Sequence, residues 1–355
     1  MDSTMSNPRN LYRYRRSQDY SIEALIMNDF YLSTPESFND PYDVSFYFQP
    51  EVVKQYIQKR LSKNKLDRLV RVFNIGQGDK SSIVDDFYDL LMNRLIFEIK
   101  NNFLIACLST ECNDEVMWAH YSDNGKGFVL EYEYCDLENM IEIYKEELVN
   151  DYLDYARFND YLKDITRERI EQSVSIFGIS KVNYQDNKPS STDTMKMLVD
   201  FFVDLIEMDI PDSRDELSQI RFNEEVLVNI TKKSLLKIDS TLKDTLAQSL
   251  HKQLLLTKKQ KWIYENEFRV VIPNIDLNFR YESSTYRKFT GLKPSAIIMG
   301  EFMNLRNRFT CAKIAYENKI PLKEIKSNFN VNPPKIEVRD VNFTKILNDE
   351  EVDKC

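Results

Sequence analysis

The order of predicted strands and helices along this chain limits its fold more than any other sequence feature. Apolar residues at three- and four-residue spacing predict long helical segments over residues 51–100, 136–176, 192–208 and 215–258. Shorter helices are predicted over residues 22–28, with Ser21 as N-cap, over 114–121, with Asn113 as N-cap, and over 302–318. Short strands are predicted at residues 11–16, 30–34, 44–48, 103–109, 128–132, 179–184, 261–272, 296–300 and 335–341.

Strands and helices do not alternate strictly in this order, which argues against a parallel doubly wound sheet. The sequence instead predicts an α+β fold, with small mixed or antiparallel sheets and large helical insertions at about 51–100 and 136–258. No segment is rich enough in Pro, Gly or Ser to act as a linker between domains. We therefore expect residues 1–355 to form a single elaborated domain.

Composition excludes several classes of protein. With 42% hydrophobic residues in 355, the chain has enough apolar surface to fold and is not disordered. Its net charge of −9 argues against a protein that coats nucleic acid non-specifically. There are only seven glycines, and none forms a Gly-x-Gly-x-x-Gly motif or a phosphate-binding Gly-x4-Gly-Lys loop. A Rossmann site and a P-loop nucleotide site are both excluded on this ground.

Cysteine usage and hydropathy indicate the cellular compartment. The five cysteines are odd in number and include no Cys-x-x-Cys pair, so we expect neither a disulfide framework nor a structural zinc site. Residues 1–10 lack the apolar core of a signal peptide. No run approaches the ~20 apolar residues that span a bilayer. We expect a cytoplasmic protein with reduced cysteines and no membrane contact.

Two carboxylates and an arginine occur at alternate positions in the predicted strand 261–272. Side chains alternate between the faces of a strand, so Glu265, Glu267 and Arg269 share one face, while Phe268 and Val270 on the other face belong to the core. Paired carboxylates suit chemistry that builds positive charge on a sugar, because one stabilises that charge and the other activates the nucleophile. An exposed edge strand with a Glu–Arg pair is the structural alternative.

A lysine-rich run, residues 258–261, precedes this strand. It could attract an anionic substrate to the mouth of a site. It is equally typical of the solvated end of a helix, where lysine complements the helix dipole.

A short predicted helix carries Trp118, His120 and Tyr121. His120 is one of only two histidines in the chain and lies between two aromatic residues. Aromatic neighbours suit stacking on a nicotinamide or a base, and the imidazole suits phosphate binding or proton transfer. A core histidine with a satisfied hydrogen bond is the alternative.

The N-terminal region holds a strand of alternating Tyr and Arg and a turn-rich segment, residues 35–43. Asn, Asp and Pro are the usual residues of turns, because the Asn and Asp side chains bond to nearby backbone. Asp40 and Asp43 are therefore either turn formers or acidic groups that a rigid turn directs into a cleft.

Taken together, these segments resemble a bacterial family, domain-of-unknown-function family 2971. The resemblance is carried by Leu-Tyr-Arg-Tyr-Arg (11–15), Leu-Ser-Thr-Pro with Phe-Asn-Asp-Pro-Tyr-Asp (32–43), Met-Trp-Ala-His-Tyr with Gly-Phe-Val-Leu-Glu-Tyr (117–132) and Trp-Ile-Tyr-Glu-Asn-Glu-Phe-Arg (262–269). It implies a bacterial or phage origin and no established activity.

More distantly, the order of these motifs is similar to that of the ADP-ribosyltransferase superfamily. This resemblance implies a split sheet with NAD as the substrate held between its halves. Glu267 would bind the nicotinamide ribose and stabilise positive charge there, Glu265 would assist the acceptor, and His120 would complete the catalytic group. The resemblance places Arg15 or Arg13 at the NAD phosphates and Ser33 and Thr34 near the nicotinamide half. Further candidates for binding NAD are Tyr12, Trp118, Tyr121 and Arg269.

Three hypotheses of function follow from the sequence. The first is an ADP-ribosyltransferase-like enzyme, a toxin or phage-defence effector that modifies a protein or nucleic-acid acceptor. The second is a metal-dependent nuclease or other phosphodiesterase, whose ligands would be Asp40, Asp43, His120, Glu265 and Glu267. The third is a non-enzymatic binding or sensor protein. The sequence does not determine the oligomeric state.

Overall fold

The fold is described from a computed structural model of the chain. It describes residues 7–40, 42–44, 49–62, 78–101, 103–157, 166–175, 177–186, 254–274, 285–333 and 335–347, with isolated positions 67, 70, 76, 192, 195, 196, 199, 200 and 203. Most of the predicted strand at 44–48 and most of the predicted helical segments between 192 and 253 lie outside these residues.

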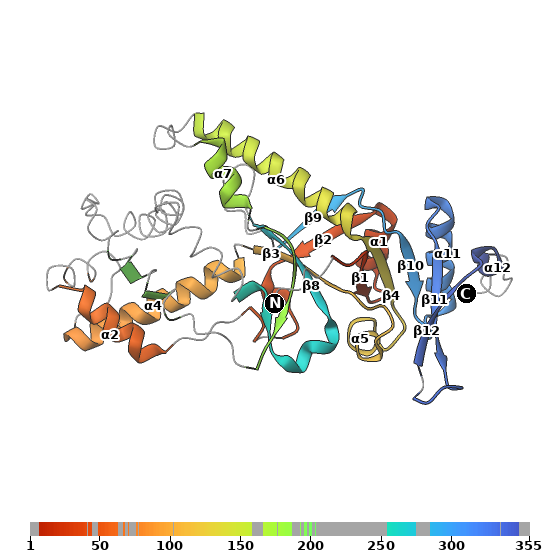
Figure 1. Cartoon of the computed structure of the whole chain (residues 1–355), viewed down its shortest axis with the longest axis horizontal. Helices are drawn as coiled ribbons and strands as arrows, with labels where there is room; N and C mark the ends of the chain where they lie inside the picture. The colour runs from red at the N-terminus through yellow and green to blue at the C-terminus, as the bar shows by residue number, and fades with distance from the viewer. Residues whose placement is uncertain are drawn as a thin grey trace.

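A large mixed sheet forms the centre of the molecule (Figure 1). Its strands run in the order β12-β11-β10-β4-β1-β3-β2-β9, with β8 and then β5 attached to β3. The bounds are β1 (Asn10–Arg15), β2 (Asp29–Ser33), β3 (Phe103–Ser109), β4 (Phe128–Glu133), β5 (Gly178–Lys181), β8 (Glu267–Pro273), β9 (Tyr286–Thr290), β10 (Ala296–Met299), β11 (Leu322–Asn328) and β12 (Lys335–Asp340). All its pairs are antiparallel except β10 with β11. A separate parallel pair joins β6 (Asn183–Tyr184) to β7 (Thr257–Lys258).

The sheet splits at β3. Strand β8 pairs with β3 along its whole length, from Phe103 to Ser109, and therefore occupies one entire edge. Strands β1 and β2 must share the other edge: β1 pairs at Ser109, and β2 pairs at Ile105. The position between these two contacts is Cys107, so β1 and β2 diverge from one another beside this residue.

Helices and short 3-10 turns surround the sheet. Their bounds are α1 (Asp19–Met27), η1 (Pro35–Ser37), α2 (Pro50–Arg60), α4 (Lys80–Asn101), α5 (Glu115–Tyr121), α6 (Tyr134–Arg157), α7 (Arg167–Val174), η4 (Gln260–Glu265), α11 (Leu305–Asn318) and α12 (Phe343–Leu347). The main core lies where α1, α6 and α11 cover one face of the sheet. On the other face, α5 and η4 pack on β1, β4 and β10 through a smaller apolar cluster.

A second apolar cluster lies away from the sheet. It joins α2 and α4 with Met195, Val199 and Val203, and Figure 1 shows these two helices at the end of the molecule opposite α11. None of the helices in the described part of the chain combines the length and the apolar character that crossing a bilayer requires.

The α+β class predicted from the sequence is confirmed, and the prediction of β3 is confirmed to the residue. The predicted strand 261–272 is wrong in its first half, because residues 260–265 form the 3-10 turn η4 and the strand begins at Glu267. The helix predicted at 22–28 begins at Asp19, so Ser21 is not its N-cap. Strands β9 and β11 were not predicted from the sequence.

Candidate functional site

A sharp corner between η4 and β8 brings Glu265 and Glu267 to the same group. Asn266 at this corner has a positive φ of 43°, a left-handed conformation that Asn adopts more readily than most residues. The corner lets both carboxylates reach the ammonium of Lys258, at 2.5 Å for Glu265 and 3.2 Å for Glu267. The two carboxylates therefore meet through a turn and a shared lysine, not through strand alternation.

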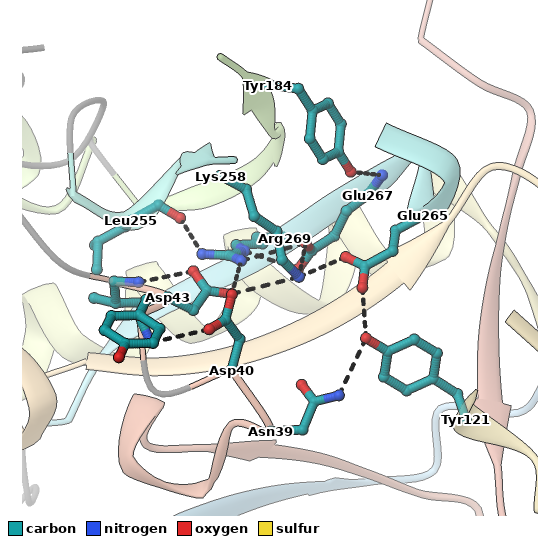
Figure 2. Close-up of polar contacts among 12 residues, drawn as sticks. Asn39, Asp40, Asp43, Tyr121, Tyr184, Leu255, Lys258, Glu265, Glu267 and Arg269 are labelled. Atoms are coloured by element: carbon teal, nitrogen blue, oxygen red, sulfur yellow. Dashed lines mark hydrogen bonds and ion pairs between the residues drawn. The ribbon is translucent and has the colours of Figure 1, made fainter. Parts of the chain in front are cut away.

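Arg269 extends this group to a loop far away in the sequence. Its side chain is fully buried, and its guanidinium donates to Glu267 at 2.8 Å, to the carbonyl of Leu255 at 2.7 Å and to Asp43 at 2.7 Å (Figure 2). Lys258 also lies 3.4 Å from Asp43. We call Asp43, Lys258, Glu265, Glu267 and Arg269 the buried charge cluster; each is at most 7% exposed.

The turn predicted from residues 35–43 supplies the Asp43 carboxylate. Asp40 accepts from the N–H of Tyr42, and Asp43 accepts from the N–H of Val44, so both carboxylates stabilise the turn. The second oxygen of Asp43 faces Arg269. Asp43 is thus a turn former and a member of the cluster, whereas Asp40, among the residues that the structure describes, bonds through its side chain to the turn alone.

The two glutamates differ in their affinity for a proton. Burial opposes the ionisation of Glu267, but the charges of Arg269 and Lys258 outweigh it and lower the pKa to about 2. Burial raises the pKa of Glu265 to about 7; the charge of Glu267 acts in the same direction, and Lys258 opposes it. Two neighbouring carboxylates whose pKa values are pushed apart are a common arrangement in enzymes that need an acid–base group beside a permanent charge.

Tyr121 connects Glu265 to the molecular surface. Its hydroxyl donates to the free oxygen of Glu265 at 2.5 Å and accepts from the side chain of Asn39 at 3.3 Å. Tyr121 is half-buried and Asn39 is exposed. Figure 2 shows the three side chains in a row leading away from Lys258. The half-buried Tyr121 therefore lies between Glu265 and solvent, and Asn39 orients its hydroxyl.

Cys107 lies beside Glu267 at the split of the sheet. The residue is exposed, yet burial raises the pKa of its thiol well above the ordinary value, and the charge of Glu267 adds to this effect. A side chain that is open to solvent and also surrounded by protein atoms lies in a recessed part of the surface. Cys107 is also the cross-strand partner of Arg269, so it lies on the face of β3 that meets the buried charge cluster.

His120 lies at the outer edge of the site. It is exposed, and its Nδ1 is 3.3 Å from the hydroxyl of Tyr264, the residue before Glu265. The interpretation as a core histidine is therefore wrong. The structure shows no hydrogen bond from His120 to either glutamate, so the site places it at the rim and not between the two carboxylates.

Two residues predicted to contact NAD are instead buried and bonded to the backbone of the protein. Arg13 is buried over the ring of Phe30, and its guanidinium donates to the carbonyl of Tyr31, so it joins β1 to β2 across the split. Trp118 is 2% exposed in the core, and its indole donates to the carbonyl of Cys112. Neither residue presents a free group to a ligand.

The remaining predicted residues have mixed positions. Thr34 is 2% exposed, while Ser33 is half-buried and bonds to Ser37. Tyr12 pairs across the strands with Ser109, which pairs with Glu267, so it shares the face of the buried charge cluster. Arg15 leaves β1 on the opposite face.

Lys258 and Arg269 have roles that the sequence did not indicate. Lys258 was assigned to a solvated or substrate-attracting run, but it is 5% exposed and contacts three carboxylates. Arg269 was assigned to NAD, but each of its nitrogens donates to the protein. The strand was also not an exposed edge, because β8 is paired on both sides, with β3 and β5.

The carboxylates that meet at Lys258 are not arranged to hold a metal ion. The described residues contain no group of three or more His, Cys, Asp and Glu side chains arranged as metal ligands. Within the cluster, Lys258 and Arg269 occupy the space between the carboxylates, where a cation would have to bind.

In a comparison with protein-family models, residues 117–270 match a family described as protein of unknown function (DUF2971). The resemblance to DUF2971 is confirmed. The matched segment contains most of α5, all of η4 and most of β8, and with them Tyr121, Lys258, Glu265, Glu267 and Arg269. Asp43 and Asn39 lie outside the matched segment, but their side chains bond to Arg269 and Tyr121 within it. Searches of curated proteins and of solved structures return no match.

Proposed function

We propose that this chain is an ADP-ribosyltransferase-like enzyme that uses NAD as its substrate and Glu265 and Glu267 as its functional carboxylates. The observation that carries the proposal is the pair itself. One lysine holds both carboxylates, and their pKa values lie at about 7 and about 2. Transfer from NAD needs a fixed negative charge and a group that takes a proton near neutral pH, and this pair supplies both.

Glu267 supplies the fixed charge. Its carboxylate is ionised at all physiological pH values and is held by Arg269 and Lys258. As nicotinamide leaves with the electron pair of the glycosidic bond, positive charge develops on the ribose, and a nearby carboxylate stabilises that charge. The exposed thiol of Cys107 marks the side from which a substrate approaches Glu267.

Glu265 accepts the proton that the acceptor group loses during the transfer. When an acceptor hydroxyl or amine bonds to the ribose carbon, it must lose a proton, and a carboxylate with a pKa of about 7 accepts it efficiently. The hydroxyl of the half-buried Tyr121 is the group beside Glu265 that passes this proton toward the surface. Without an acceptor, water takes the same place and NAD is hydrolysed.

The nuclease hypothesis is less well supported by the site. Its proposed ligands include His120, which lies at the rim, and Asp40, which bonds to its own turn. The carboxylates that do converge are already paired with Lys258 and Arg269.

The hypothesis of a non-enzymatic protein predicts that the cluster only holds the fold together. A role as toxin or phage-defence effector stays part of our proposal and rests on resemblance alone.

The proposal is tested by incubating the purified chain with NAD and measuring free nicotinamide by chromatography. We expect release by the wild-type protein and a fall of about 100-fold or more in Glu267→Gln. Glu317→Gln, at an exposed position on α11, is the matched control and should retain full activity. Circular dichroism and thermal unfolding of each variant separate loss of chemistry from loss of fold.

If Glu267→Gln does not fold, Tyr121→Phe provides a second test, because it removes only the hydroxyl that bonds to Glu265. Equal nicotinamide release by the folded Glu267→Gln variant and the wild type would contradict the role of Glu267. No release by the wild type, with protein and nucleic-acid acceptors both supplied, would contradict the proposed function.

A further inference from the structure

A row of aromatic rings borders Glu265 on the surface. The ring centroids of Trp262 and Tyr264 are 6.0 Å apart, those of Tyr264 and His120 are 6.1 Å apart, and those of His120 and Tyr121 are 6.3 Å apart. The row starts on η4 and ends on α5. His120 is exposed, and the other three residues are half-buried. The row ends at Tyr121, whose hydroxyl bonds to Glu265.

Two exposed lysines extend this row. The ammonium of Lys261 lies 5.0 Å from the ring centre of Trp262, and that of Lys259 lies 5.0 Å from the ring centre of Tyr42. Tyr42 is 65% exposed. Cation–π contacts of this kind hold the lysine side chains beside the rings and leave their charges in solvent. We call Tyr42, Lys259, Lys261, Trp262, Tyr264 and His120 the aromatic–lysine surface.

The charge of this surface is opposite to that of the whole chain. The net charge is −9, yet η4 and the residue before it carry two exposed lysines, and their one carboxylate, Glu265, is buried. Asp114, whose charge acts on Tyr264, is engaged as the N-cap of α5. A local positive charge among aromatic rings suits a ligand that carries both anionic groups and flat apolar groups.

We propose that the aromatic–lysine surface binds single-stranded nucleic acid and holds it beside Glu265 as the acceptor of the transfer. The inference rests on the proposed function for the transfer step, but not for binding. Proteins that bind single strands combine lysines on the phosphates with aromatic rings that stack on bases. A protein acceptor needs no such alternation of rings and ammonium groups. A duplex hides its bases, so the rings would have no partner.

The expected binding is weak and depends on few charges. Each phosphate contact on a single strand contributes about −0.7 to the slope of log K against log salt concentration, so two lysines predict a slope of about −1.4. Each ring that stacks on a base should change the affinity by about fivefold or more when replaced by alanine.

The test measures fluorescence anisotropy of a labelled oligothymidylate of about 15 nucleotides with the full chain and without NAD. We expect binding with the predicted salt slope, a slope near zero in the double variant Lys259→Ala/Lys261→Ala, and at least about fivefold weaker binding in Tyr42→Ala. Lys313→Ala and Tyr316→Ala, at exposed positions on α11, are the matched controls and should bind like the wild type.

Several outcomes overturn the inference. No binding by the wild type does so, and so does equal binding of an oligoglutamate of matched charge, which indicates attraction of any anion. Nicotinamide release from NAD, measured in parallel without nucleic acid, separates the two proposals. Release that persists in Lys259→Ala/Lys261→Ala while oligonucleotide binding is lost supports the inference. Loss of release in that variant overturns it, because the lysines then serve NAD.

Discussion

Replacing Lys258 by methionine removes the positive charge that the two glutamates share, with little change in side-chain volume. The ammonium of Lys258 lies 2.5 Å from Glu265, 3.2 Å from Glu267 and 3.4 Å from Asp43, and the residue is 5% exposed. In the variant, Arg269 still pairs with Asp43 and Glu267, whereas Glu265 loses its ion pair and keeps the hydrogen bond from Tyr121. Removing one partner from a buried ionic group typically costs about 3–5 kcal/mol. For a chain of this size, this cost corresponds to a fall of about 10 °C in Tm.

The loss of stability in Lys258→Met should depend on pH, and the direction of this dependence follows from the pKa of Glu265. Lys258 opposes the effect of burial on this carboxyl, so its removal raises the pKa of Glu265 further above about 7. The folded variant then holds a proton that the unfolded chain loses above its ordinary pKa of about 4.3. Stability from a raised carboxyl pKa is present at low pH and is lost as pH rises. The variant should therefore be destabilised more at about pH 8 than at about pH 6.

Thermal unfolding at these two pH values measures the effect, with Lys259→Met as the matched control at the neighbouring exposed position. The control should change Tm by no more than about 2 °C at either pH. A Lys258→Met variant as stable as the wild type would refute the buried ionic cluster. An equal loss of stability at both pH values would refute the raised pKa of Glu265.

Three further predictions concern residues that shape the site. Gly127→Ala should give a poorly folding protein, because an added Cβ would lie 2.0 Å from the carbonyl of Arg15; a urea midpoint equal to that of the wild type would contradict this contact. Asp114→Ala removes the side chain that accepts from the N–H of Met117 and should cost about 1 kcal/mol in urea unfolding, whereas Asp114→Asn should cost little. Trp118→Ala should cost about 3–5 kcal/mol in the same assay, as expected for a core residue; a loss below about 1 kcal/mol would show that the ring is not packed as described.

The sequence predicted those parts of the fold that depend on local pattern. The apolar strand Phe103–Ser109 and the end of α5 at Tyr121 both follow from local pattern, whereas the N-cap predicted at Asn113 is wrong, because Asp114 caps the helix. Strands β9 (Tyr286–Thr290) and β11 (Leu322–Asn328) were missed because most of their residues are charged or polar and show no clear apolar pattern. They become strands by pairing with β2 and β10, and those pairings are not encoded locally.

The site was predicted in part. Glu265 and Glu267 were chosen for a shared strand face, and the structure brings them together through the corner at Asn266 instead. The burial of Lys258 could not be predicted, because an isolated lysine in a polar run carries no sign of its partners. Its burial depends on Asp43, more than two hundred positions away in the sequence. Cys107 was missed because its importance depends on where the sheet splits.

The pH dependence of nicotinamide release tests the central claim. This claim is that Glu267 supplies a fixed negative charge while Glu265, with a higher pKa, accepts a proton. For the wild type we predict activity that rises with pH through about 7, as Glu265 loses its proton and becomes able to accept one. In Glu265→Gln this rise should disappear and the remaining activity should be low and flat, while Glu317→Gln keeps the wild-type profile. A Glu265→Gln variant that is folded and retains both the rate and the pH profile of the wild type would contradict the account.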